Sequence, residues 1–332
     1  MLASLMAEVE DPVIEARDLV RIYRSSTGMI RKRYKETLAV DHISFSVGRG
    51  ELFGILGPNG AGKTTTIKML TTLLIPTSGK ATILGYDVQH DAMEVRKRIG
   101  LVLGGERGLY YRVSGRQNLR YFADLYGVPL HGRERRIQEV LDMVGLSEKA
   151  DVKVENYSRG MKQKLHIAKG IVHDPEVIFL DEPTIGLDPQ ASRDTRRMTQ
   201  ELIGMGKTML LTTHYMLEAD ELCGRIAVIN GGKLLALDTP AGLKSLVKDT
   251  SVIEVEGFGI TDLEMEKVRA LDGVRAVSST TNGSKQVMRV QVCDAGELLT
   301  PVTRSLECRV LDVHVKEPTL EDAYLWLVEG HA

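Results

Sequence analysis

The chain has 332 residues, enough for one large domain or two modest ones with a substantial core. Hydrophobic residues make up 43% and charged residues 27%, as in an ordinary soluble globular protein. The net charge of −2 at pH 7 gives no support to binding of nucleic acid or a membrane surface through bulk charge. Three cysteines without Cys-x-x-Cys spacing suit a reducing cytoplasm and argue against a disulfide framework or a zinc site.

The first residues, "MLASLMAEVEDP", have no basic start and only a very short apolar stretch, so no signal peptide is predicted. No window of 18 or more residues lacks charge, so no membrane-spanning segment is predicted. If a membrane matters to this protein, we expect a partner to supply it.

Two segments near the start, residues 13–23 and 39–57, show partial alternation of apolar and polar residues between turns marked by glycine. This pattern predicts short strands that form an antiparallel lead-in to the next motif. The segment between them, residues 24–36, is basic and polar, and we expect a solvated loop there.

The stretch "GPNGAGKTTT" fits the pattern Gly-x-x-x-x-Gly-Lys-Thr, from Gly57 through Gly62 and Lys63 to Thr64. Glycines let a backbone wrap a phosphate with its N–H groups, and the helix that follows points its positive end at the anion. Lys63 can reach the β- and γ-phosphates, and the Thr64 hydroxyl can ligate Mg²⁺. An apolar run precedes the motif and a helical pattern follows it. The chain is therefore predicted to bind a nucleoside triphosphate.

From Gly115 the pattern becomes helical. In residues 133–146, apolar side chains recur at helical spacing and form one stripe: Ile137, Val140, Leu141 and Val144. We interpret this stripe first as core packing and only second as a partner surface.

Two later segments each read as a buried strand with polar residues at its end. Residues 177–180, "VIFL", form an uninterrupted apolar run that Asp181 and Glu182 follow. Residues 207–216 repeat the design and place His214 at the strand end. Because ligands of open α/β sheets bind at the carboxyl ends of the strands, we expect the glycine loop, the Asp181–Glu182 pair and His214 to meet in one crevice.

Between the glycine loop and "VIFLDEP" lies "YSRGMKQKL", residues 157–165. A small hydroxyl and a glycine open a lysine-rich helical pattern, which predicts a second anion-binding helix N-terminus. The chain thus has two predicted phosphate-binding helix ends but a single glycine loop.

After about Val247 the sequence changes character. Segments 251–257, 274–281, 286–292 and 310–317 read as strands, and 262–271, 295–306 and 319–330 read as helices. The order βαββαβα predicts a small ferredoxin-like α/β domain. RNA-recognition modules share this outline, but they stack bases on strand aromatics, and these four segments contain none.

Taken together, these motifs resemble the ATP-binding subunit of an ABC transporter, whose signature "LSGGQ" occupies the position of residues 157–161. The resemblance covers roughly Val13 to Val247. It implies an α/β fold: a P-loop ATPase domain over residues 13–247, with an antiparallel β lead-in and a helical subdomain at about 106–174. A C-terminal accessory or regulatory domain over 248–332 follows.

The resemblance also implies residue roles. The phosphates are cradled by Gly57, Pro58, Asn59, Gly60, Ala61, Gly62, Lys63, Thr64 and Thr65. Tyr23 stacks on adenine, Asp181 positions Mg²⁺ together with Thr64, and Glu182 is the catalytic base. His214 senses the γ-phosphate, and Asp188 belongs to the "GLD" dimer loop. Ser158, Arg159 and Gly160 contact ATP held by the opposite subunit of a homodimer or ABC heterodimer.

The sequence departs from the family pattern in two places. Arg159 replaces the first of the two usual signature glycines, while Ser158 and Gly160 are kept. Family members usually place a glutamine shortly after a strand like residues 98–103, yet residues 90–116 contain none in that place. We expect Glu106, in "LGGERGLYY", to take over the task of this glutamine at the Mg²⁺ or the attacking water; the alternative is a surface salt bridge.

The C-terminal segment 317–330 resembles the tail of ATP-binding subunits of drug- and antibiotic-resistance exporters. The resemblance implies a cytoplasmic ATPase at the inner face of the membrane that uses ATP and Mg²⁺ to drive a separate permease, exporting a drug, lipid or polymer. No nucleic-acid partner is expected. The alternative is a soluble ABC ATPase of translation, repair or iron–sulfur assembly, although the chain has one ATPase cassette and no coiled-coil or zinc insertion.

Overall fold

The structure, a computed structural model, describes residues 11–27, 33–104, 108–247, 251–283, 285–316 and 318–329. These residues divide into two compact units, one reaching Leu237 and the other starting at Asp238. The division lies before a short helix, α8 (Pro240–Ser245), whereas the change in sequence pattern lies after Val247.

The first unit is built around a six-stranded sheet. Its strands lie in the order β10 (Lys233–Asp238), β9 (Arg225–Asn230), β3 (Leu52–Leu56), β8 (Thr208–Thr213), β7 (Val177–Asp181) and β6 (Ile99–Val102). From β9 to β6 neighbouring strands are parallel. Every residue of β3, β7 and β8 is buried, as expected of central strands covered on both faces. Their carboxyl ends therefore lie side by side at one edge.

A second sheet is antiparallel, as predicted for residues 13–23 and the first part of 39–57; the end of that second segment instead forms β3 of the parallel sheet, so the prediction was wrong there. The strand order of this second sheet is β2 (Arg33–Val47), β1 (Ile14–Thr27), β4 (Ser78–Ile83) and β5 (Tyr86–Asp87). The prediction of a loop over residues 24–36 was wrong for most of that segment. The β1–β2 ladder continues from Arg24 opposite Glu36 to Thr27 opposite Arg33. Backbone pairing, helped by a 2.8 Å ion pair between Arg24 and Glu36, prevails over the polar composition.

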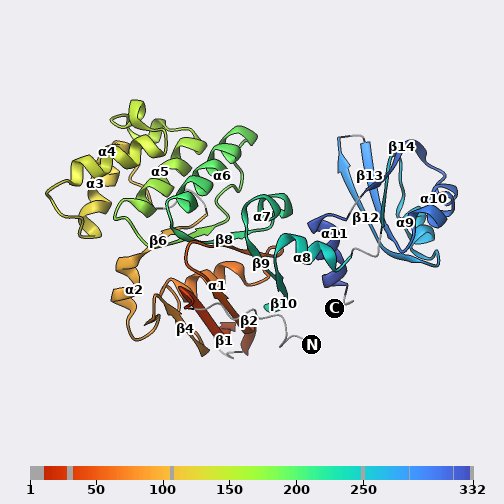
Figure 1. Cartoon of the computed structure of the whole chain (residues 1–332), viewed down its shortest axis with the longest axis horizontal. Helices are drawn as coiled ribbons and strands as arrows, with labels where there is room; N and C mark the ends of the chain where they lie inside the picture. Colours follow the sequence, from red (N-terminus) through yellow and green to blue (C-terminus); the bar gives the residue numbers. More distant parts are fainter. Residues whose placement is uncertain are drawn as a thin grey trace. The chain divides into compact units, whose positions relative to one another are not determined.

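Seven helices of the first unit are described: α1 (Lys63–Leu70), α2 (Ala92–Arg98), α3 (Gly115–Leu125), α4 (Arg133–Met143), α5 (Arg159–Ile171), α6 (Pro189–Gly204) and α7 (Met216–Leu222). Two 3₁₀ turns cover Ser147–Lys149 and Val154–Asn156. Helix α1 contacts both sheets, and the core gathers around it, with Phe45 and Phe53 stacked 5.1 Å apart. Helices α3, α4 and α5 pack on one another on the far side of β6 and β8 from β1 and β2 (Figure 1). The predicted apolar stripe of α4 and its C-terminus is buried.

The second unit has the predicted βαββαβα order. After α8 it contains β11 (Ser251–Phe258), α9 (Asp262–Arg269), β12 (Val274–Asn282), β13 (Lys285–Val292), α10 (Ala295–Arg304), β14 (Arg309–Lys316) and α11 (Leu320–Val328). The antiparallel sheet order β12-β13-β11-β14 is that of a ferredoxin-like fold. Strand β11 runs one residue beyond the predicted segment and ends on an aromatic side chain, Phe258.

Candidate active site

The glycine loop connects β3 to α1, and two of its glycines are required by close approaches. A Cβ atom on Gly57 would lie 2.2 Å from the carbonyl oxygen of Ile229. Gly62 has φ +105° and its Cβ would lie 2.5 Å from the carbonyl oxygen of Ala39. The loop encloses a cavity of about 150 Å³, lined by Ala39, Asn59, Gly60, Gly62, Lys63, Thr64, Thr65 and Glu182. Ala39 of β2, the loop and Glu182, just after β7, thus share one hollow at the N-terminus of α1.

Lys63 is the first residue of α1, and its side chain is only 4% exposed. Its ammonium group donates to the carbonyl oxygens of Gly57 at 2.8 Å and Pro58 at 3.1 Å. It also lies 3.0 Å from a carboxylate oxygen of Glu182. A buried ammonium needs such partners, and these contacts hold its charge at the cavity wall.

Asp181 ends β7 and is buried beside two hydroxyls. Thr64 donates to its two carboxylate oxygens at 3.1 and 3.0 Å, and Thr212 of β8 donates at 2.6 Å. A carboxylate and a hydroxyl at a phosphate-binding loop are hard oxygen ligands of the kind Mg²⁺ takes, with the remaining positions left to phosphate and water. Among the described residues, no three His, Cys, Asp or Glu side chains form a metal-ligating cluster. The residues therefore fit a nucleotide-bound Mg²⁺ better than an all-protein metal site.

Glu182 has a strained backbone, and its carboxylate lies between Lys63 and His214. Its φ of +48° is rare for a residue with a side chain. The conformation is held by its N–H group, which donates to the carbonyl oxygen of Thr212 at 3.0 Å and to its hydroxyl at 3.2 Å. Strain of this kind collects at functional sites. Here it turns the carboxylate toward Lys63.

His214 follows β8 and approaches the other Glu182 oxygen, with Nδ1 at 3.2 Å. The angles are not those of a hydrogen bond, so the two groups are adjacent without being tied to each other. The glycine loop, Asp181, Glu182 and His214 thus meet at the carboxyl ends of β3, β7 and β8, which is the expected crevice.

The signature segment opens α5. Ser158 caps this helix by accepting from the N–H group of Met161 at 3.2 Å, and a Cβ on Gly160 would lie 2.9 Å from that of Ala191 in α6. Arg159 donates to the carbonyl oxygen of Ile185 at 3.3 Å and lies against Gly186. None of these signature residues lines the glycine-loop cavity.

Two other predicted residues, Asp188 and Tyr23, do not line that cavity. Asp188 caps α6 by accepting from the N–H group of Ala191 at 2.8 Å. Tyr23, in β1, is 38% exposed, and the Arg21 guanidinium lies 5.0 Å from its ring centre. Glu106 lies outside the described residues.

The sequence reasoning missed Thr212, which contacts both Asp181 and the backbone of Glu182. Its signal was present in "LLTTH", where a hydroxyl interrupts an apolar strand just before its end. It also missed Ala39, whose carbonyl oxygen lies against Gly62 and which lines the cavity.

The comparisons agree with this geometry. A family model described as "ABC transporter" matches residues 40–185. The daunorubicin resistance ATP-binding protein DrrA2 of Streptomyces coeruleorubidus is 39% identical, over 91% of this chain and 94% of its own length. The linearmycin resistance ATP-binding protein LnrL of Bacillus subtilis is 34% identical, over 89% of this chain and 95% of its own. The solved structure of cbiO1 from Clostridium perfringens, part of an ABC transporter complex, matches with TM-score 0.62 and 26% identity, over 72% of this chain and 94% of that one.

The fold and the site define a P-loop ATPase cassette. A relative is 39% identical over about nine-tenths of this chain, so the chain belongs to the ATP-binding proteins of the ABC transporter family. The members of this family are ATPases coupled to transport. Within the described ranges, no helix is long and apolar enough to cross a membrane.

Proposed function

We propose that two copies of this chain bind and hydrolyse ATP between them and thereby power a separate membrane permease that exports a hydrophobic compound. The observation that carries the chemical part is the meeting of Lys63, Glu182 and His214 at the cavity under the glycine loop. The family membership carries the coupling to transport.

Each of the three residues has a task that suits its position. Lys63 offers a positive charge at the start of α1, where the helix dipole and the loop N–H groups also favour phosphate oxygens. Glu182 serves as the general base that takes a proton from the attacking water. His214 borders the same carboxylate, so it can contact the terminal phosphate and the water together. Tyr23 stacks on the adenine.

Mg²⁺ would be held by Thr64 and Asp181, which the structure brings together. When bound, it neutralises charge on the phosphates. Thr212 keeps Asp181 in place by donating to it at 2.6 Å.

The second phosphate contact comes from a partner subunit. Ser158, Arg159 and Gly160 open α5 but line no part of the cavity formed by Lys63 and Thr64. A two-fold dimer gives each cavity the signature segment of the other chain, with the Asp188 loop between them, and so makes two equivalent sites. Such a dimer closes on ATP and opens after hydrolysis.

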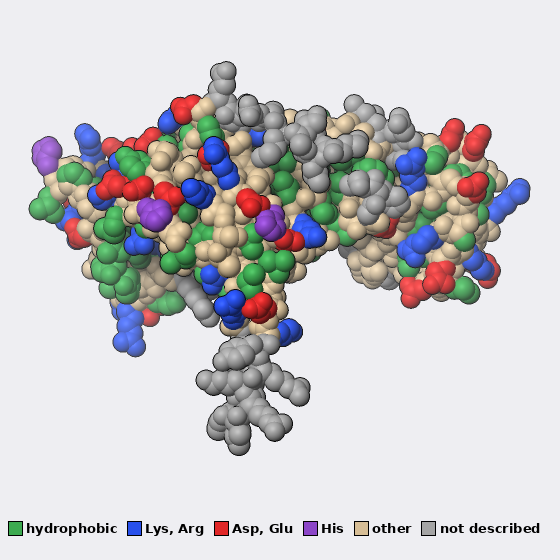
Figure 2. Space-filling model, turned by 90° about the horizontal axis from the view of Figure 1, so that it is seen from below, with side chains coloured by type: hydrophobic (Ala, Val, Ile, Leu, Met, Phe, Trp, Pro, Cys, Tyr) green, Lys and Arg blue, Asp and Glu red, His purple; other side chains and the backbone are tan. Residues whose placement is uncertain are grey.

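The exporter assignment follows the whole-length relatives. Two of them are named for resistance to daunorubicin and to linearmycin, and both match the C-terminal unit as well as the cassette. The soluble alternative in translation, repair or iron–sulfur assembly has no such support. On the face shown in Figure 2, acidic and basic side chains are interspersed, which does not favour a nucleic-acid partner. We place the chain in the cytoplasm, held at the membrane by its permease.

Mixing two inactive variants tests the shared site. Lys63→Ala removes a phosphate contact of roughly 1.5–3 kcal/mol but keeps the signature segment. Ser158→Arg blocks the signature segment but keeps the glycine loop. A mixed dimer has one intact site, so we expect ATP-dependent association and part of the turnover to return on mixing. Glu148→Arg, on an exposed position of the same unit, is the control and should behave as wild type. A mixture no more active than its separate components contradicts the shared site.

A further inference from the structure

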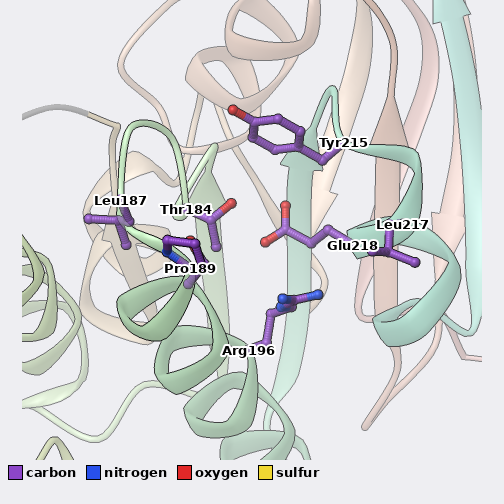
Figure 3. Close-up of a pocket in the computed structure, with 8 residues that line it drawn as sticks. Thr184, Leu187, Pro189, Arg196, Tyr215, Leu217 and Glu218 are labelled. Atoms are coloured by element: carbon purple, nitrogen blue, oxygen red, sulfur yellow. The ribbon is translucent and has the colours of Figure 1, made fainter. Parts of the chain in front are cut away.

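A second cavity, of about 310 Å³, lies beside α6 and α7 and shares no lining residue with the glycine-loop cavity. It is lined by Thr184, Leu187, Pro189, Ser192, Arg196, Tyr215, Leu217 and Glu218 (Figure 3). Two of the polar residues among them are buried: Thr184 and Glu218. The carboxyl group of Glu218 enters the cavity from α7, and the residue is only 4% exposed.

The Glu218 carboxyl has no strong partner. No described residue makes a hydrogen bond of good geometry to either oxygen. The nearby Arg196 is paired with Glu221 instead, at 2.6 Å. Burial raises the pKa of Glu218, and the hydroxyls of Thr213 and Thr184, with the charges of Arg196 and His214, only partly oppose this. A buried acid in such a setting is normally costly, so its presence calls for a function.

The two hydroxyls beside Glu218, those of Thr184 and Thr213, come from the ends of the two strands that carry the candidate active site. Thr184 is two residues beyond Glu182, after β7. Thr213 is the last residue of β8, immediately before His214. Figure 3 shows the Glu218 carboxyl turned toward Thr184 across the gap between the two turns. One side chain in α7 thus borders both segments that carry the adjacent Glu182 and His214.

We propose that Glu218 is a positioning residue that bridges the hydroxyls of Thr184 and Thr213 and thereby sets the spacing of Glu182 and His214. The proposal rests on the proposed ATPase function of that pair. The Thr213 hydroxyl accepts from the N–H group of Tyr215 at 3.0 Å, which leaves its own hydrogen free to donate to the carboxyl. Closure of the bridge fixes both turns to α7 without contact with the nucleotide.

A simpler role is also chemically reasonable, because a carboxylate in the first turn of a helix stabilises the helix through its charge. The two roles differ in what they require. A bridge requires hydrogen-bonding capacity at that position, which glutamine keeps. Stabilisation by charge requires a carboxylate, which glutamine lacks.

The test measures steady-state turnover and KM for ATP in Glu218→Ala and Glu218→Gln, alone and combined with His214→Ala. We expect Glu218→Ala to lower kcat by about tenfold to a hundredfold with little change in KM, the cost of misplacing a catalytic group by about 1 Å. Glu218→Gln should recover most of that loss. Because the bridge sets the spacing of Glu182 and His214, it matters little once the His214 side chain is gone, so adding Glu218→Ala to His214→Ala should cost little more. Glu201→Ala, on an exposed position of the neighbouring helix α6, is the matched control and should stay near wild type.

Three results would overturn the proposal: Glu218→Ala with wild-type kcat, Glu218→Gln as impaired as Glu218→Ala, or an equal loss in the presence and absence of His214. Thermal unfolding of each variant shows whether a loss of kcat comes only from a loss of folding stability. If Glu218→Ala does not fold, the kcat of Glu218→Gln is compared with that of the wild type. The proposed ATPase function is judged separately, by wild-type turnover and its loss in His214→Ala.

Discussion

Two buried glutamates, Glu264 in the C-terminal unit and Glu218 in the cassette, differ in how their carboxyl groups are hydrogen-bonded. In the C-terminal unit, Glu264 accepts from the N–H groups of Glu307 at 2.7 Å and Cys308 at 2.8 Å, and from the N–H and hydroxyl groups of Thr261 at 2.8 and 2.7 Å. In the cassette, Glu218 has no well-formed hydrogen bond from any residue that the structure describes. A buried carboxylate whose hydrogen bonds are all made stabilises the fold, whereas one that lacks hydrogen bonds can still form them within a functional site.

The pKa values follow the same division. Burial raises the pKa of Glu264, but the hydrogen bonds from Thr261, Glu307 and Cys308 outweigh it and lower the pKa to about 2. Burial raises the pKa of Glu254 as well, and its ion pairs with Lys316 and Arg289 lower it below the usual value. For Glu218 the balance is reversed, and the pKa is raised. The C-terminal unit therefore stabilises charge, and the cassette holds an acid that resists ionisation.

The largest effect should come from Glu182→Gln, which removes the base and leaves the phosphate cradle. We expect ATP binding to persist and turnover to fall by about a hundredfold or more, in line with the loss of a general base. The variant should also accumulate as an ATP-bound dimer, which size-exclusion chromatography with ATP and Mg²⁺ can detect. Glu139→Gln, a surface change in α4, is the control. Wild-type turnover in Glu182→Gln would remove Glu182 from the catalytic role.

A smaller effect, confined to the other unit, is expected from Glu264→Gln. Charged hydrogen bonds contribute about 1.5–3 kcal/mol each, so the C-terminal unit should unfold more easily while ATP turnover stays near wild type. Because the folded pKa is about 2 and the ordinary value is 4.5, the stabilisation is complete above pH 4.5 and is lost as the pH falls toward 2. Glu307→Gln, whose side chain is 80% exposed, should change stability by less than about 1 kcal/mol.

Thermal unfolding of wild type and Glu264→Gln between pH 2 and pH 6 measures this difference. The two curves should converge at the acid end. Parallel curves would mean that the Glu264 charge does not stabilise the C-terminal unit.

The smallest effect on chemistry is expected from removal of the second unit. All the candidate active-site residues precede Leu237, so a chain ending there should fold and change turnover by less than about threefold, under roughly 1 kcal/mol of activation free energy. A chain ending after Val247 is the matched comparison. It keeps α8 without α11, on which α8 packs, so it should be less soluble. An insoluble or nucleotide-free product of the shorter cut would show that the two units fold together.

Local patterns were sufficient for the motifs and for much of the fold. The apolar run before Asp181 predicted a buried parallel strand, and the meeting of the glycine loop, the acids and His214 at strand ends followed from sheet geometry alone. The apolar run before Gly57 was assigned to the antiparallel lead-in, but it forms β3 of the parallel sheet. The βαββαβα order of elements along the C-terminal unit was predicted as well. In these cases the relevant interactions are between neighbours along the chain or along a strand.

Where two interacting residues are distant in sequence, their contact was predicted wrongly or not at all. The polar segment 24–36 gave no sign of the ladder that pairs Arg24 with Glu36. Glu218 sits in "HYMLEADEL", which has the composition of a solvent-facing helix, and only the packing of α7 near Thr184 shows that it is buried. Thr212 and Asp181 meet because β7 and β8 are adjacent, which the sequence order does not specify.

The arginine in the signature segment has a consequence for exchanging motifs between related chains. Gly186 has φ +65°, and a Cβ there would lie 2.3 Å from a guanidinium nitrogen of Arg159. The two positions therefore constrain each other's side chains although they belong to different motifs. Recombination that brings a larger residue to the second position of a chain with this arginine would require the guanidinium to move, and the positive φ of that position would strain the new side chain. We therefore expect the glycine to be kept when these two motifs are exchanged between related chains.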